Sequence, residues 1–355
     1  MPDRLLTIRQ GALQAYRFNV ASGVVQGEPI VIAQGFSAAA ANSMFAASDA
    51  GVLAYRAGTA QRRQLVWVNR QGAVQRVIGE PESDFIASPE LSADEQSAVV
   101  FLQRTGDNDI WVIELARNLA HRVTDGPPAD AHPLWDPDGQ HVVFSSRRFA
   151  GGGPARQALS GGKAEPLFAG GENGLPLSWT RDRRFILIRR DGATSGSDLV
   201  AVATEGERRE VVVAQSQYDE AEGQFSPDGK WVAFGSNESG RPEVFVQSFP
   251  ERRGRTQIST GGGAQIRWSG DGKEIFYVAP DGKMMAASIA FGGASPEVKL
   301  PVPLFQTHLA TGTNVLGFKP QYAVSRDGRF LLNTAIESAS APIVVSVNWM
   351  KKLTK

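Results

Sequence analysis

The chain has 355 residues, of which 42% are hydrophobic and 8% aromatic, so it holds enough apolar material for a sizeable core and is not globally disordered. Lysine plus arginine number 37 and aspartate plus glutamate number 37, and this balance argues against a general polyanion-binding protein. The absence of cysteine excludes disulfides, cysteine-ligated metal sites and thiol nucleophiles.

The N-terminal segment is expected to be a strand. Residues 1–9 lack the long apolar region of a signal peptide, and no apolar run in the chain approaches the ~18–20 residues that a membrane helix needs. Because this strand would begin abruptly, we expect the chain to be a fragment or to start at an internal methionine.

One short pattern recurs from residue 45 to the C-terminal region. An apolar or aromatic residue precedes Ser/Asp-Pro-Asp-Gly or a relative of it, and a run of Val, Ile, Phe or Tyr follows; the clearest copy is Phe-Ser-Pro-Asp-Gly-Lys-Trp-Val-Ala-Phe at 225–234. Serine or aspartate suits the first position of a turn, proline the second, and glycine the position with positive φ, so each copy predicts a hairpin. The turn aspartates are Asp49, Asp94, Asp138, Asp182, Asp228, Asp271 and Asp327.

Five of the six intervals between these aspartates are 43–46 residues long. A third and a fourth run of strand-forming residues follow most of the hairpins, for example 109–113 and then 121–124. Four short strands in about 40–45 residues are the signature of a β-propeller blade. The longer interval between Asp271 and Asp327 is interpreted as a loop insertion within one blade.

The sequence therefore predicts an all-β fold, a β-propeller of four-stranded antiparallel blades in a single domain over residues 1–355. Seven turn motifs favour seven blades, with six and eight as alternatives. Residues 35–355 would hold seven repeats of about 44 residues, and residues 1–34 would complete the C-terminal blade. Such a closure leaves no open strand edges, which invite aggregation.

The repeats resemble TolB-type, WD-repeat-like β-propellers, and more specifically the C-terminal propeller region of bacterial transmembrane serine/threonine protein kinases. The stretches that carry the resemblance are residues 5–13, 51–56, 225–234, 236–246, 261–263 and 347–349. In that family the propeller follows a cytoplasmic kinase domain and a membrane helix. The resemblance implies a sensing or docking role on the periplasmic or extracellular side.

The chain carries no catalytic motif that we could identify. Kinase loops, a phosphate-binding loop and a Gly-x-Ser-x-Gly elbow are missing, and the histidines do not have zinc-site spacing. The turn aspartates are interpreted as structural and not as calcium ligands. We expect no catalytic residues, no metal site and no cofactor.

A candidate binding site lies where the chain enters each inner strand, near one mouth of the central channel. The acidic bias of these segments hints at a cation or a cationic peptide, and ordinary loop polarity is the alternative. The candidate residues are Asp84, Asp130, His132, Glu172, Asp219, Glu220, Glu222, Gln265 and Arg267.

The favoured function is a non-catalytic binding or sensor module in a receptor-like kinase. It would be a monomer that binds a protein, a peptide or an envelope ligand, without nucleic acid and without membrane contact by this chain. One alternative is a propeller that accompanies a serine hydrolase or peptidase. Another is a propeller with a metal-dependent lyase or hydrolase site in its channel.

Overall fold

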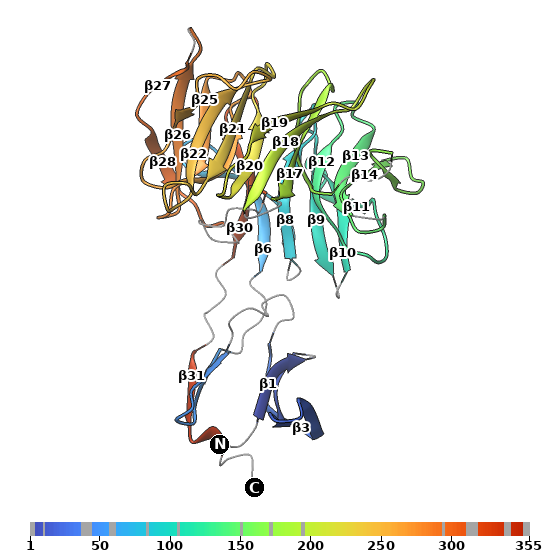
Figure 1. The fold of residues 1–355 in the computed structure, drawn as a ribbon, viewed down its shortest axis with the longest axis vertical. Helices are drawn as coiled ribbons and strands as arrows, with labels where there is room; N and C mark the ends of the chain where they lie inside the picture. Colours follow the sequence, from blue (N-terminus) through green and yellow to red (C-terminus); the bar gives the residue numbers. More distant parts are fainter. Residues whose placement is uncertain are drawn as a thin grey trace. The chain divides into compact units, whose positions relative to one another are not determined.

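The computed structural model describes residues 4–9, 11–36, 45–56, 62–82, 85–104, 107–149, 152–169, 173–192, 196–292, 295–309, 319–336 and 342–350. Antiparallel β-strands dominate these ranges (Figure 1). Within them, no helix is long and apolar enough to cross a membrane. The chain divides into two compact units: unit 1 is Met1–Arg62, Pro81–Phe85 and Ile336–Lys355, and unit 2 is Arg63–Glu80 and Ile86–Ala335.

Unit 2 is built from similar antiparallel sheets, most of which pair four strands in the order in which they occur along the chain. Within the described residues there are six sheets with this blade pattern, five of them built from consecutive strands. Blade 1 is β8 (Phe85–Leu91), β9 (Ser97–Arg104), β10 (Asp107–Glu114) and β11 (Leu119–Arg122); blade 2 is β12 (Asp130–Trp135), β13 (His141–Ser146), β14 (Pro154–Ala158) and β15 (Glu165–Pro166); blade 3 is β16 (Leu175–Trp179), β17 (Phe185–Asp191), β18 (Ser197–Ala203) and β19 (Glu210–Ala214). Blade 4 is β20 (Glu220–Phe225), β21 (Trp231–Ser236), β22 (Glu243–Ser248) and β23 (Thr256–Gln257); blade 5 is β24 (Ala264–Trp268), β25 (Glu274–Val278) and β26 (Lys283–Ala290), with β27 (Glu297–Val298) and β28 (Val302–Gln306) both paired to β26.

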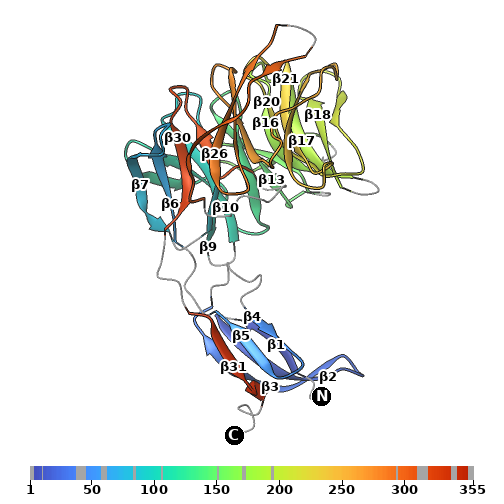
Figure 2. The ribbon, with the colours of Figure 1, turned by 90° about the vertical axis from the view of Figure 1, so that its left-hand side faces the viewer.

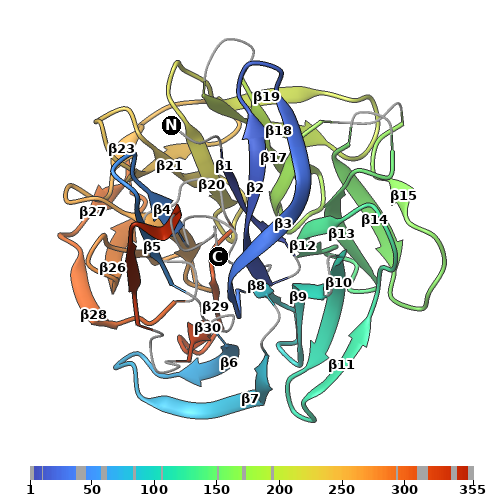
Figure 3. The same ribbon diagram turned by 90° about the horizontal axis from the view of Figure 1, so that it is seen from below.

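The sixth blade joins two distant parts of the chain. Its inner strands are β29 (Tyr322–Val324) and β30 (Phe330–Ala335), and its outer strands are β6 (Arg63–Val68) and β7 (Val74–Glu82). The β30–β6 register runs from Phe330 opposite Val68 to Ala335 opposite Arg63, and Figure 2 shows the two strands side by side. One hydrophobic core contains Trp67 and Leu331 of this blade and Val100 of blade 1, so blade 6 packs against blade 1 and closes the ring (Figure 3).

The strand pairing corrects two expectations about the ends of the chain. Residues 1–34 do not complete the C-terminal blade, because β1 (Arg4–Arg9), β2 (Ala12–Asn19) and β3 (Val24–Gln34) pair with one another in a three-stranded sheet. The repeat that begins at Asp49 is divided, since β4 (Phe45–Ala47) and β5 (Val52–Tyr55) pair with β31 (Val344–Val347) in unit 1 while β6 and β7 close unit 2. Six of the seven turn motifs therefore lie in the six blades of the described ring, and the seventh, at Asp49, lies in unit 1.

Unit 1 has a small core of its own. Leu13 and Ala15 of β2, Leu53 of β5, Phe36 and Trp349 are buried together. Because the side chains of a strand alternate between two faces, each three-stranded sheet contributes one face to this core.

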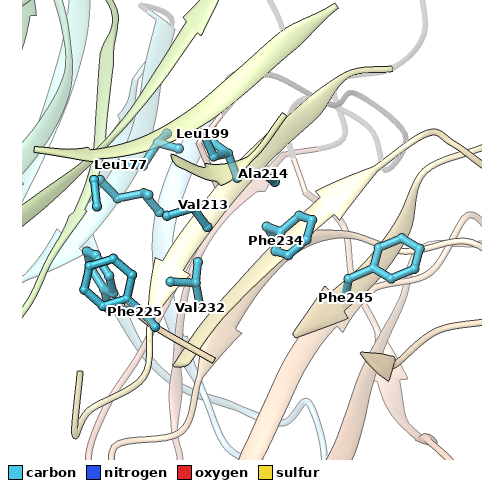
Figure 4. Close-up of a cluster of buried hydrophobic side chains, with 11 residues drawn as sticks. Leu177, Leu199, Val213, Ala214, Phe225, Val232, Phe234 and Phe245 are labelled. Atoms are coloured by element: carbon cyan, nitrogen blue, oxygen red, sulfur yellow. The ribbon is translucent and has the colours of Figure 1, made fainter. Parts of the chain in front are cut away.

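The blades of unit 2 are held together by apolar side chains at blade interfaces. The cluster in Figure 4 joins Leu177, Leu187 and Leu199 of blade 3 to Phe225 and Phe234 of blade 4. Burying each such side chain contributes on the order of 1.5–3 kcal/mol. A single blade exposes both of its faces, so this stabilisation exists only in the assembled ring.

The hairpin turns have the structure that the motif predicts. In blade 4 the Ser226 hydroxyl donates to the Asp228 carboxylate (2.6 Å), which also accepts the backbone N–H of Lys230 (3.1 Å), and Gly229 has a φ of 71°. The same serine–aspartate bond recurs at Ser269 and Asp271 (2.7 Å). The turn aspartates thus stabilise the hairpins.

Candidate functional site

The first strand of several blades carries an irregularity at the same place. The residues six positions before the turn aspartates include Ser88, His132, Glu222 and Gln265, whose φ angles are 55°, 55°, 58° and 60°. The register of β12, β20 and β24 with their neighbours shifts at this point, as in a β-bulge. A bulge redirects a side chain, and these first strands surround the centre of the ring (Figure 3).

An ion-pair network joins blades 1, 5 and 6 to blade 2. The Arg267 guanidinium donates to the Glu90 carboxylate (2.8 Å) and to the backbone oxygen of Tyr322 (3.0 Å). The Lys319 ammonium lies 3.6 Å from the Glu90 carboxylate and donates to the backbone oxygen of Pro133 (2.7 Å). Burial lowers the pKa of Lys319 to about 7, with Arg267 acting in the same direction and Glu90 opposing it.

A second set of buried polar groups lies between blades 4, 5 and 6. The Glu222 carboxyl accepts the backbone N–H of Gln265, whose side-chain oxygen accepts the backbone N–H of Gln321 (2.9 Å). The Tyr322 hydroxyl donates to the backbone oxygen of Gln265 (2.7 Å). Burial raises the pKa of Glu222 to about 8, against the opposing effects of the Gln265 N–H and the Arg267 charge, so this carboxyl is protonated at neutral pH.

The other carboxylates of the predicted site are engaged within the protein. Asp130 is buried and pairs with Arg148 (2.7 Å), and Asp219 accepts a hydrogen bond from the side-chain amide of Asn237 (3.0 Å). Glu220 accepts a bond from the Ser216 hydroxyl (2.6 Å), and burial raises its pKa. These acidic side chains therefore already have partners within the protein. Asp84 and Glu172 lie outside the described residues.

A pocket of about 430 Å³ opens where β12 and β16 begin. His132 lines it, with Nδ1 3.0 Å from the Ser145 hydroxyl. Burial, together with the positive charges of Lys319 and Arg189, lowers the pKa of His132 to about 3, so its imidazole is neutral at physiological pH. The remaining polar lining comes from Asn108, Ser145, Ser146, Arg147, Asn173, Arg189 and Asp191.

The turn of blade 2 brings potential metal ligands together. One ligand atom from each of Asp136, Asp138 and His141 lies within 4.8 Å of the others. However, Arg156 donates to both carboxylates (2.8 and 2.6 Å), and Arg183 lies 3.1 Å from Asp136. Because two guanidinium groups already balance these charges, the cluster favours the structural interpretation of the turn.

The sequence predicted part of this arrangement. His132, Glu222, Gln265 and Arg267 lie on the first strands of three different blades, and Asp130 and Glu220 begin two of these strands. Asp130, Asp219 and Glu220 contact Arg148, Asn237 and Ser236, respectively. Sequence reasoning missed Glu90, Lys319, Gln321, Tyr322 and Arg189. Counting six residues back from each turn aspartate would have found Gln321 and Ser88.

Comparison with known proteins agrees with this architecture. The family model of the TolB beta propeller domain, PD40, matches residues 43–223. A putative TolB from Agrobacterium tumefaciens has a similar fold, with a TM-score of 0.59 at 16% identity over 78% of this chain and 99% of that chain. TolB from Acinetobacter baumannii aligns with a TM-score of 0.45 at 14% identity, over 96% of this chain and 80% of that chain.

One curated relative matches part of the chain. The protein named "Uncharacterized peptidase YuxL", from Bacillus subtilis (strain 168), is 29% identical over 168 residues, which is 47% of this chain. The match spans 23% of the length of that relative. The family match, together with the four-stranded antiparallel blades, shows that this chain belongs to the PD40 family of TolB beta propeller domains.

Proposed function

We propose that unit 2 is a non-catalytic binding module that recognises a protein, a peptide or an envelope ligand at the pocket between blades 2 and 3. The observation that carries the proposal is the open pocket of about 430 Å³ at the start of β12 and β16. Concave sites of about 300–1,000 Å³ with a few polar groups are typical of small-ligand recognition.

The channel network supports a binding role over a catalytic one. Glu222 and Lys319, two of the deeply buried groups with shifted pKa values, contact backbone groups and the Glu90–Arg267 pair. The Ser145 hydroxyl, which lies next to the neutral His132, donates to the backbone oxygen of Ala131 (3.1 Å). These contacts use the polar groups to fix the ring, and they favour a rigid scaffold around the pocket.

The larger protein in which this module works is a separate proposal. The resemblance of residues 236–246 and the other stretches named above supports the sensor half of a receptor-like serine/threonine kinase, facing the periplasm or the extracellular side. The partial match to a protein named as a peptidase supports the second candidate, a propeller that accompanies a hydrolase. The coding DNA on both sides of this chain separates them, since the first requires an in-frame kinase domain and membrane helix and the second a hydrolase domain.

The binding role is tested with a displayed peptide library and hydrogen exchange. We expect selected peptides to bind with one-to-one stoichiometry, to remain intact, and to protect the amides of residues 129–132, 145–147, 173–175 and 189–191. Protection confined to the turns at the opposite ends of the first strands would contradict the assigned site. Hydrolysis of the peptides, abolished by a single side-chain substitution, would contradict the non-catalytic role.

A further inference from the structure

Two pairs of consecutive arginines lie near the pocket of blades 2 and 3, at residues 147–148 and 189–190. In each pair, one arginine forms an ion pair within the protein and the other lines the pocket. Arg148 pairs with Asp130 (2.7 Å), and Arg190 pairs with Glu210 (2.9 Å). Their neighbours Arg147 and Arg189 both line the pocket of blades 2 and 3. Because successive side chains of a strand point to opposite faces, the β17 residues Arg189 and Arg190 are directed apart.

Arg147 and Arg189 lack a polar partner in the part of the chain that the structure describes. Neither guanidinium makes a hydrogen bond or an ion pair there, and Nε of Arg189 is buried without a hydrogen-bond partner. A buried donor without a partner destabilises the protein, and a charged donor does so more strongly. The unmet hydrogen bond points to an acceptor supplied from outside the protein.

The charge of the pocket selects the kind of acceptor. Its ionised lining residues are Arg147, Arg189 and Asp191, and its imidazole, His132, is neutral, which leaves a net charge of one positive unit. A carboxylate carries one negative charge and matches the planar fork of a guanidinium with two parallel hydrogen bonds. A phosphate dianion would exceed the pocket charge and would be repelled by Asp191.

A second orphan group indicates that the ligand also carries a donor. Oδ1 of Asn108 lines the same pocket and is buried without a hydrogen-bond partner. The peptide N–H beside a C-terminal carboxylate is a donor only a few bonds away from the two oxygens. Ala129, Ala131 and Leu175 add apolar surface for the last side chain.

We propose that this pocket binds the C-terminal carboxylate of a peptide. The Arg189 guanidinium donates two parallel hydrogen bonds to the carboxylate, and Arg147 supplies a second positive charge. The side-chain oxygen of Asn108 accepts the hydrogen bond of the terminal peptide N–H. This inference rests on the proposed binding function and names the group that is recognised. It replaces the cationic ligand suggested by the acidic bias of the sequence with an anionic one.

The test compares probes that differ only in the recognised group. N-acetyl-tetra-alanine with a free carboxylate, the same peptide as the C-terminal amide, and succinate are titrated into the intact chain by calorimetry at low and physiological salt. We expect the free acid to bind at least 10-fold more tightly than the amide and than succinate. Equal affinity for acid and amide, or no binding of the acid at millimolar concentration, would overturn the proposal. Succinate binding as tightly as the acid would also overturn it, in favour of a free small carboxylate.

Matched arginine variants locate the binding group. Arg189→Gln is expected to weaken binding of the acid at least 10-fold, and Arg189→Lys by less, because it keeps the charge but loses the fork. Arg252, an exposed arginine outside the pocket, provides the control Arg252→Gln, which should leave the affinity unchanged. Thermal unfolding of each variant shows that the fold is retained. Unchanged affinity in Arg189→Gln refutes the carboxylate site; if library peptides still protect the pocket in hydrogen exchange, the binding function itself survives.

Discussion

Glu222 allows the buried polar network to be tested by measuring the free energy of unfolding at several pH values. Its side chain is buried between blade 4 and its neighbours, and this burial raises its pKa from 4.5 to about 8. An acid whose pKa is raised on folding favours the folded state least at high pH, because the unfolded chain ionises first. The penalty is therefore small below pH 4.5, grows as the pH rises from 4.5 to 8, and is constant above 8.

The size of the effect follows from the two pKa values. At about 1.4 kcal/mol per pH unit, the Glu222 penalty grows by a few kcal/mol between pH 5 and pH 8. Glu222→Gln removes this titration and keeps an oxygen that can accept the backbone N–H of Gln265. We expect the free energy of unfolding of the variant, relative to that of the wild type, to increase by a few kcal/mol from pH 5 to pH 8.

Urea unfolding at pH 5, 6, 7 and 8 measures the difference between the two proteins. Taking the difference removes the contribution of other groups that titrate in the same range, Lys319 above all. The exposed Glu207 supplies the control Glu207→Gln, whose stability should run parallel to the wild type. A constant difference between wild type and Glu222→Gln from pH 5 to 8 would refute the assignment of a protonated, buried carboxyl.

Three further substitutions test other contacts of unit 2 by urea or thermal unfolding. Arg267→Met leaves the Glu90 carboxylate without its 2.8 Å partner and should cost about 3 kcal/mol; a loss below 1 kcal/mol would show that the pair is not needed. Arg148→Met leaves the fully buried Asp130 without its 2.7 Å partner, and we expect a similar loss; an unchanged free energy of unfolding would show that this pair is not needed. Gly223→Ala places a Cβ against a leucine of β17 and should cost about 1–3 kcal/mol, and a neutral result would mean that blade 3 can shift to make room.

The fold was predictable where it depends on local turn chemistry. The Ser-Pro-Asp-Gly copies fix hairpins through bonds within a few residues, such as Ser226 to Asp228, so the sequence alone locates them. The closure was not predictable in this way, because the partner of β5 is chosen by long-range packing. The hairpin at Asp49 has the same local pattern as the others, yet it pairs with β31 and not with β6.

The site was predictable only in part for a similar reason. Position at the entry of an inner strand is a local property, and on that basis the sequence predicted His132, Glu222 and Gln265 as candidates. Whether a charged residue has an ion-pair partner depends on residues far away in the sequence. Arg267, for example, pairs with Glu90, which lies 177 positions away. The arginine pairs also look alike in sequence, and only the structure separates Arg148, which has a partner, from Arg147, which lines the pocket.

The closing blade also makes unit 2 a candidate for transplantation. Arg63 and Ala335 are direct register partners, so the segment between them leaves and re-enters the rest of the chain at adjacent points. Inserted domains of this kind tolerate grafting and circular permutation, because their ends lie close together. A permuted unit 2, opened in a surface turn and joined across residues 63 and 335, would keep every blade while moving its ends to a place of the experimenter's choice.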